Sequence, residues 1–273
     1  SVGNLRTIAS IAARFIDASS RIAVCGQPPV STLNLAHMVP SSAVWAGPER
    51  DDHLGAPPLL YGRTEGSTPF RLSLHVGDVG HTLVVGPTGA GKSVLLALMA
   101  LQFRRYPRAQ VFAFDFGGSI RACALAMQGD WHDLGGELTD AADASVSLQP
   151  LARIHQTSER AWAADWIVAI LMRENIQITP DVKEHIWTAL TSLASAPVGE
   201  RTITGLAVLL QSNDLKQALR PYCVGGPYGR LLDAESEHLG SADVQAFEIE
   251  GLVGTGAAPA ALSYLFHRIG DRL

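Results

Sequence analysis

Residues His81 to Phe103 read HTLVVGPTGAGKSVLLALMALQF, and this stretch decides the fold. It begins with an apolar run, Thr82 to Val85, whose β-branched side chains favour a strand. A glycine-rich turn follows the run. After the turn, apolar residues recur at helical spacing as far as Leu101. The stretch therefore predicts a strand, a tight turn and a helix, in that order.

The turn carries a phosphate-binding motif. Gly86, Gly91, Lys92 and Ser93 match the P-loop pattern G-x-x-x-x-G-K-S/T between the predicted strand and helix. Glycines let the loop turn its backbone N–H groups inward, and the helix dipole adds positive potential there. Lys92 and Ser93 are the predicted catalytic residues, since they are expected to contact the β- and γ-phosphates of ATP and to ligate Mg²⁺, respectively. The predicted nucleotide-binding set is Gly86, Pro87, Thr88, Gly89, Ala90, Gly91, Lys92, Ser93 and Val94.

The composition of the chain limits the classes of protein to which it can belong. A chain of 273 residues suffices for one large domain or two small ones. The net charge of −5 argues against a strongly basic nucleic-acid groove. The three cysteines are far apart and form no C-x-x-C pair, which is typical of a reducing compartment. No apolar run approaches the roughly 20 residues that cross a bilayer, so no membrane span is predicted.

The hydrophobic patterns divide the chain into four parts. Residues 1–60 are predicted to form an N-terminal helix and an irregular arm, and residues 61–150 the first part of an α/β core. Residues 151–240 carry helical patterns only and are interpreted as an insertion, after which the core resumes at 241–273. The strand–helix alternation before the insertion predicts a mainly parallel sheet covered on both faces. Buried tryptophans are expected in the insertion at Trp162, Trp166 and Trp187.

Several stretches resemble one family of motor proteins. They are the run from Thr64 to Ser93, FAFDFGGS at Phe112 to Ser119, the block from about Leu206 to Asp233, and ALSYLFHRI at Ala261 to Ile269. All four are similar to the ATPases of conjugal transfer and type IV secretion, and to the TrbE type in particular. The resemblance implies a RecA-like P-loop NTPase core with a helical insertion, preceded by an N-terminal arm.

The same resemblance implies an activity and a location. ATP hydrolysis would drive substrate translocation or pilus assembly. The protein would form a homo-oligomer, expected to be a hexamer, together with other components of the conjugation or secretion machine. It would be cytoplasmic and peripheral at the inner membrane. The transported substrate and direct contact with DNA stay open.

One departure from the family concerns the catalytic carboxylate. In the family, a Walker B strand ending in Asp-Glu follows the helix that contains Leu265, and the chain is expected to stop before it. A fragment of this kind should bind nucleotide and hydrolyse it poorly. An alternative function is a nucleotide-dependent assembly switch without turnover. A GTPase is not predicted, because the base-reading pattern N-K-x-D does not occur.

Carboxylates inside the chain offer possible substitutes. Asp115 ends a predicted strand and is a candidate Mg²⁺ ligand, the other interpretation being a hydrogen bond to the turn at Gly117-Gly118. Glu248 and Glu250 are predicted to share one strand face, where they either approach the phosphates or are solvated. His132 with Asp133 is a further candidate catalytic pair.

Overall fold

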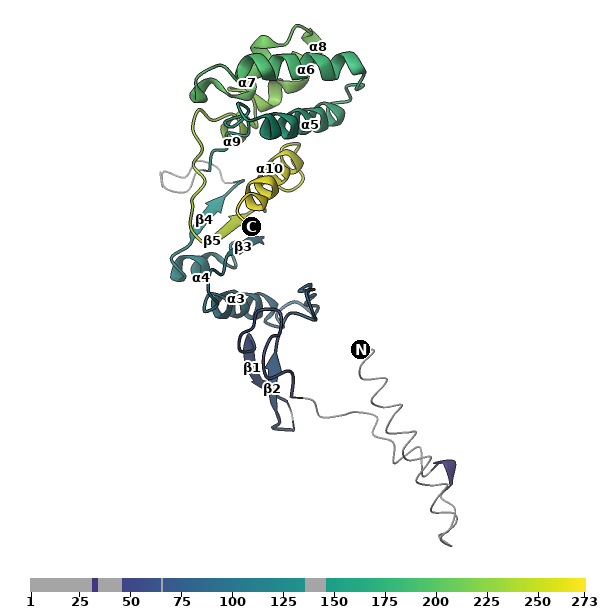
Figure 1. The fold of residues 1–273 in the computed structure, drawn as a ribbon, viewed down its shortest axis with the longest axis vertical. Helices are drawn as coiled ribbons and strands as arrows, with labels where there is room; N and C mark the ends of the chain where they lie inside the picture. Colours follow the sequence, from purple (N-terminus) through teal and green to yellow (C-terminus); the bar gives the residue numbers. More distant parts are fainter. Residues whose placement is uncertain (1–30, 34–45, 65, 136–145) are drawn as a thin grey trace. The chain divides into compact units, whose positions relative to one another are not determined.

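The computed structural model describes residues 31–33, 46–64, 66–135 and 146–273. The chain divides into two compact units, residues 1–82 and 83–273 (Figure 1). The helix predicted from Asn4 to Ala18 lies outside the described residues, as do Trp45 and most of the predicted irregular arm.

The first unit contains an antiparallel pair of strands, β1 (Leu60–Arg63) and β2 (Pro69–Leu72). The sequence predicts β2 but extends it to Val76, which is exposed and forms only an isolated bridge with Val79. The prediction is wrong beyond Leu72 because ladder pairing with β1 ends there.

The second unit holds the other elements. In chain order they are α3 (Lys92–Phe103), β3 (Val111–Asp115), α4 (Arg121–Ala126), β4 (Asp130–Asp133), α5 (Thr157–Arg173), α6 (Pro180–Leu193), the 3₁₀ helix η2 (Val198–Glu200), α7 (Ile203–Leu209), α8 (Asn213–Leu219), the 3₁₀ helix η3 (Arg220–Tyr222), α9 (Gly229–Leu232), β5 (Val244–Glu248) and α10 (Ala258–Gly270). Among the described residues, no helix is long and apolar enough to span a bilayer.

The central sheet has the order β3-β5-β4, and both pairings are parallel. The predicted parallel sheet is therefore confirmed. Side chains alternate between its faces, as the two-residue period of a strand requires. Phe112, Phe114 and Phe247 pack with the larger hydrophobic cluster, whereas Ala113 and Ala246 pack with a smaller cluster that includes residues of α3 and α4. The sheet is thus covered on both faces.

The helices α5 to α9 share one core with α10. The larger cluster runs from Leu134 to Leu265, and Figure 1 shows α10 between the strands and α5. The indole N–H of Trp166 donates to the carbonyl of Ala260 in α10, at 3.0 Å. Packing and this buried hydrogen bond join the helical part to the sheet through α10.

The expectation of three buried tryptophans is correct for Trp166 and wrong for Trp187. Trp166 is buried, and Trp162 is partly buried and stacks on His267 with ring centroids 4.0 Å apart. Trp187 is 40% exposed, with the guanidinium of Arg160 lying 5.7 Å from its ring centroid. The buried face of α6 includes Ile186, and the next residue projects about 100° further round the helix.

The strand predicted at Thr82 to Val85 does not form. Residues 81–87 have no regular secondary structure, and Leu83 and Val85 are 87% and 82% exposed. A strand is stabilised by hydrogen bonds to a neighbour, and the sheet order of the described residues contains no partner for this run. Branched side chains supply the propensity for a strand but not the pairing.

Candidate functional site

The loop before α3 has the backbone that its glycines predict. Gly89 and Gly91 both adopt φ +81°, in the left-handed region that favours glycine. Gly91 is the N-cap of α3, and the amide of Leu95 donates to its carbonyl at 2.9 Å. Within the loop, the amide of Ala90 donates to the carbonyl of Pro87 at 3.3 Å. The loop therefore turns tightly and delivers the chain directly into the helix.

Lys92 folds back over this loop. Its Nζ donates to the carbonyl of Gly86 at 2.9 Å and to that of Pro87 at 2.8 Å. The ammonium group is thus held against the loop by its own backbone. Because both acceptors are exposed to solvent, an anion with several oxygens competes for the same donors at little desolvation cost.

Backbone donors of the loop are available for a phosphate. Among the described residues, the amides of Gly89 and Gly91 have no hydrogen-bond acceptor, and those of the first turn of α3 point out of the helix. No acidic residue lies in that turn, so nothing there repels an anion. A Cβ added at Gly89 or Gly91 would meet no atom within 4 Å, so the space beside the loop is open. These features fit a polyphosphate, and Ser93 is exposed beside them.

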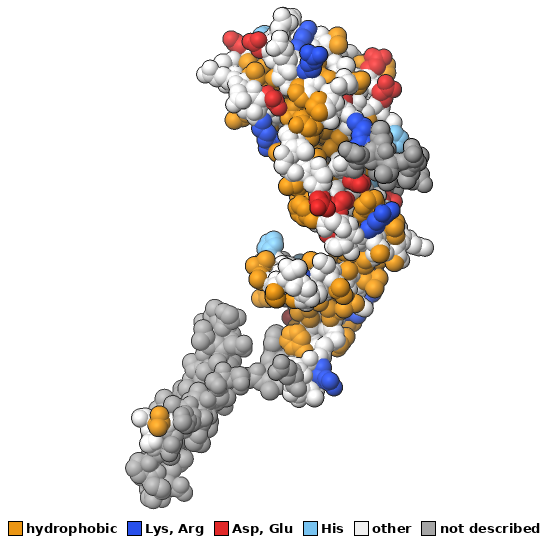
Figure 2. Space-filling model, turned by 180° about the vertical axis from the view of Figure 1, so that it is seen from behind, with side chains coloured by type: hydrophobic (Ala, Val, Ile, Leu, Met, Phe, Trp, Pro, Cys, Tyr) orange, Lys and Arg blue, Asp and Glu red, His pale blue; other side chains and the backbone are white. Residues whose placement is uncertain are grey.

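The apolar side chains around the loop are exposed as well. In α3, Met99 alone is buried among the described residues, whereas Val94, Leu96 and Leu98 are exposed. Hydrophobic side chains reach the surface at several places in the space-filling view (Figure 2). Only the small side chains of Ala97 and Ala100 contribute from α3 to the cluster that covers the sheet.

The hydrogen bond expected between Asp115 and the turn at Gly117-Gly118 does not form, and Asp115 bonds to other groups. Its carboxylate accepts from the hydroxyl of Ser119 at 2.7 Å and from the amide of Ile120 at 2.8 Å. It therefore supports the start of α4 rather than the turn at Gly117-Gly118. Both carboxylate oxygens are engaged, so a metal ligand role would need one of these bonds to break.

Glu248 holds the glycine turn instead. Its carboxylate accepts from the amides of Gly117, at 3.2 Å, and Gly118, and also from the amide of Glu250, at 2.8 Å. Glu248 is buried, so the prediction of a solvated strand end is wrong for it. Glu250 is exposed and lies beyond the end of β5. Three backbone amides stabilise the buried carboxylate of Glu248, so this carboxylate serves to hold the turn.

His132 and Asp133 do not form a catalytic pair. His132 is 7% exposed and stacks on Phe247 with ring centroids 5.2 Å apart. Its Nε2 is buried without a hydrogen-bond partner in the described part of the chain. Burial lowers the pKa of His132, and the charge of Asp130 opposes this shift in part. Asp133 accepts from the amide of Gly135 at 3.1 Å.

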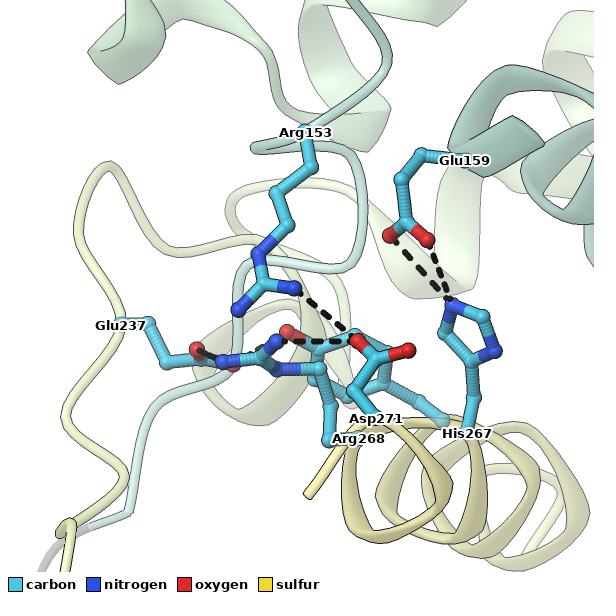
Figure 3. A network of polar contacts seen from close by, with 7 residues as sticks. Arg153, Glu159, Glu237, His267, Arg268 and Asp271 are labelled. Atoms are coloured by element: carbon cyan, nitrogen blue, oxygen red, sulfur yellow. Dashed lines mark hydrogen bonds and ion pairs between the residues drawn. The ribbon is translucent and has the colours of Figure 1, made fainter. Parts of the chain in front are cut away.

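A network of charged side chains lies away from the loop, between α5 and α10 (Figure 3). Glu159 pairs with His267 at 3.2 Å, and Asp271 pairs with Arg153 at 2.9 Å and with Arg268 at 3.4 Å. Glu159, His267 and Asp271 bring possible ligand atoms within 4.8 Å of one another. Each carboxylate already has a nitrogen partner, and two guanidinium groups would repel a metal ion. The Glu159–His267 pair therefore joins α5 to α10, and Arg153 joins the segment before α5 to the end of α10.

Comparisons with known proteins give relatives among conjugal transfer proteins. No protein-family model matches the chain. It is 43% identical over 248 residues to a probable conjugal transfer protein TrbE of Sinorhizobium fredii, covering 89% of this chain and 37% of that protein. It is 42% identical over 254 residues to the conjugal transfer protein TrbE of Rhizobium radiobacter, covering 90% and 31%. The chain is a relative of the TrbE proteins. It spans about a third of their length.

A solved structure supports the fold of this TrbE relative. The VirB4 structure from Thermoanaerobacter pseudethanolicus superposes with a TM-score of 0.57 at 14% identity, covering 76% of this chain and 61% of that one. At this identity the match shows the fold alone, an α/β fold with a parallel sheet. Type IV secretion system protein virB4 of Bartonella quintana is 25% identical over 250 residues, covering 89% of this chain.

The sequence pattern of this TrbE relative named Glu248 but not its role at the carboxyl end of the sheet. Glu248 is buried and organises the turn after β3, yet a glutamate at the end of an apolar strand is usually solvated. The pair Gly117-Gly118 was the sequence signal that could have predicted a buried carboxylate at this turn. Both glycines have positive φ, so their amides converge on one acceptor, and a strand-end carboxylate is the natural candidate.

Proposed function

We propose that this chain is the nucleotide-binding part of an ATP-driven motor of conjugative transfer or type IV secretion. The observation that carries the proposal is the loop from Gly86 to Gly91, which turns through two left-handed glycines into α3 beneath the ammonium group of Lys92. Similarity to the TrbE proteins supports the choice of machine. The motor would energise substrate translocation or pilus assembly.

Each part of the loop has a role in this proposal. Residues 86–94 would bind the phosphates of ATP, chiefly through the amides of Gly89 and Gly91 and those of the first turn of α3. Lys92 would leave its loop carbonyls and pair with the β- and γ-phosphates. The hydroxyl of Ser93 would ligate Mg²⁺, which supplies charge neutralisation at the transferred phosphoryl group. Asp115 is not included, because its carboxylate already supports the start of α4.

The assembly proposed with this function is a homo-oligomer, a hexamer by resemblance, in contact with other components of the machine. We place it on the cytoplasmic side and peripheral to the inner membrane. An assembly switch without turnover is the second candidate function. It is favoured by the state of the sheet-edge carboxylates, because Asp115, Asp133 and Glu248 all accept hydrogen bonds from backbone amides.

A titration with a fluorescent ATP analogue and Mg²⁺ tests the proposed site. Lys92→Ala should weaken binding by about tenfold to a hundredfold, because a hydrogen bond to a charged group contributes roughly 1.5–3 kcal/mol. Lys183→Ala is the matched control, since Lys183 is an exposed lysine of α6. Equal affinities of the wild type and Lys92→Ala would refute the assignment of the loop.

A further inference from the structure

The helical part carries an open groove between α7 and α8, with a volume of about 440 Å³. On the α7 side it is lined by Thr204, Ala207 and Val208, which share one helix face at spacings of three and four residues. Val208 is 72% exposed. The apolar side chains on this wall of the groove are therefore in contact with solvent.

Basic residues form the opposite rim. Lys216 lies in α8 and Arg220 one turn further on in η3, so their side chains project from the same side. Within the described residues, neither side chain has an ion pair, and no carboxylate lines the groove. The charge is notable in a chain whose net charge is −5. The groove thus combines an apolar wall with two uncompensated positive charges.

A buried carboxylate fixes the position of the segments that line the groove. Asp233 is 4% exposed and accepts from the amide and the hydroxyl of Thr204 and from the amide of Val224. These bonds tie the start of α7 to the loop that carries Cys223 at the end of the groove. A preformed groove loses little entropy when it is filled.

The lining does not favour a small polar ligand. Its polar side chains Lys216, Gln217 and Arg220 all come from the α8 side, and the hydroxyl of Thr204 already donates to Asp233. Two helices form the walls and present no free strand edge, so the matching shape is a helix. We propose that the α7–α8 groove docks an acidic amphipathic helix of a partner protein. Its apolar residues would contact Ala207 and Val208, and its carboxylates would pair with Lys216 and Arg220.

A pair of designed peptides tests this proposal on the intact chain. The acidic probe is a fluorescein-labelled peptide of about 16 residues, roughly 24 Å of helix, with leucines along one face and glutamates beside them. The basic probe has lysine at every glutamate position. Fluorescence anisotropy should show saturable binding of the acidic probe only. Alkylation of Cys223 should also slow when that probe is bound, in a Cys25→Ser, Cys123→Ser background.

Variants assign the binding to the groove. The double change Lys216→Glu and Arg220→Glu should weaken the acidic probe by roughly tenfold or more and allow the basic probe to bind. Val208→Asp should abolish binding, and its exposed side chain leaves the fold intact. Lys183→Glu in α6 is the control for a charge reversal outside the groove, and it should bind the acidic probe normally.

Other outcomes would overturn the proposal. They are equal binding of the two probes, no effect of the charge reversal, or no binding at all. Binding to phosphatidylglycerol vesicles that the double variant removes would assign the groove to a membrane. Self-association in sedimentation that the double variant removes would assign it to a second copy of this chain.

Discussion

At the scale of single residues, the site depends on backbone conformation more than on side-chain chemistry. Gly89 and Gly91 occupy the left-handed region, and the ammonium group of Lys92 donates to two carbonyl oxygens of the loop. Any other residue type at Gly91 would be strained at the position where α3 begins. The loop geometry and the helix start are therefore set by one residue.

Gly91→Ala should weaken nucleotide binding, because alanine at positive φ costs about 1 kcal/mol and shifts the loop amides. Gly225→Ala is a closely matched control. Gly225 also has φ +81° and open space for a Cβ, but it lies in the loop after η3. Thermal melting should show a similar loss of stability for both variants, and nucleotide titration should show a defect for Gly91→Ala only. Normal binding by Gly91→Ala would contradict the proposed role of this backbone position.

At the scale of elements, the three parallel strands are bound together at their carboxyl ends and in their core. Glu248 of β5 anchors the turn after β3, and His132 of β4 stacks on Phe247 of β5. The His132 ring is buried with an unpaired Nε2, so the sheet holds this ring in its neutral form. Acidification should therefore weaken the contact between His132 of β4 and Phe247 of β5.

The pKa of His132 is lower in the folded protein than its usual value of 6.5. Between these two values the unfolded state binds more protons, so stability rises with pH and falls on acidification below about pH 6.5. His132→Phe preserves a ring against Phe247 and removes the proton site. Urea unfolding should show a smaller loss of stability for His132→Phe than for the wild type as the pH falls from 7 to 5, a range chosen to span the titration of a histidine. Parallel pH profiles would show that His132 does not titrate in this way.

At the scale of the whole molecule, the described residues provide phosphate-binding groups, whereas the strand-end carboxylates of Asp115 and Glu248 are used in hydrogen bonds to the backbone. The amides of Gly89 and Gly91 and the ammonium of Lys92 are placed for phosphate oxygens. The carboxylates of Asp115 and Glu248, by contrast, accept hydrogen bonds from backbone amides, while Glu250 is exposed. Nucleotide binding and turnover are therefore expected to separate in this chain.

The isolated chain of 273 residues should bind ATP and release phosphate very slowly. Where no group orients the attacking water and no cation stabilises the transition state, the rate of phosphoryl transfer falls by about 10³-fold or more. A phosphate-release assay measures this, with Lys92→Ala as the blank. Robust hydrolysis that depends on Lys92 would contradict the expectation. Asp115→Asn and Glu248→Gln would then identify the carboxylate responsible.

The sequence by itself determined the local structure and the phosphate-binding motif. Glycine positions fix where φ can be positive, and the cap at Thr179, which accepts from the amide of Val182, marks the start of α6. Short apolar runs indicated β3 and β5, which are covered on both faces, and the period of 3.6 residues indicated α5 and α10. These features depend on neighbours within a few positions along the chain.

Only the tertiary structure decided the features that depend on partners far away in sequence. The run from Thr82 to Val85 has strand propensity but no hydrogen-bonded neighbour in the described chain. The roles of Asp115 and Glu248 differ because Gly117 and Gly118 face a carboxylate 130 residues away rather than the nearer one. The basic rim of the α7–α8 groove likewise exists only because two helices pack together. Pairing and charge environment are properties of the folded chain, and local sequence patterns do not encode them.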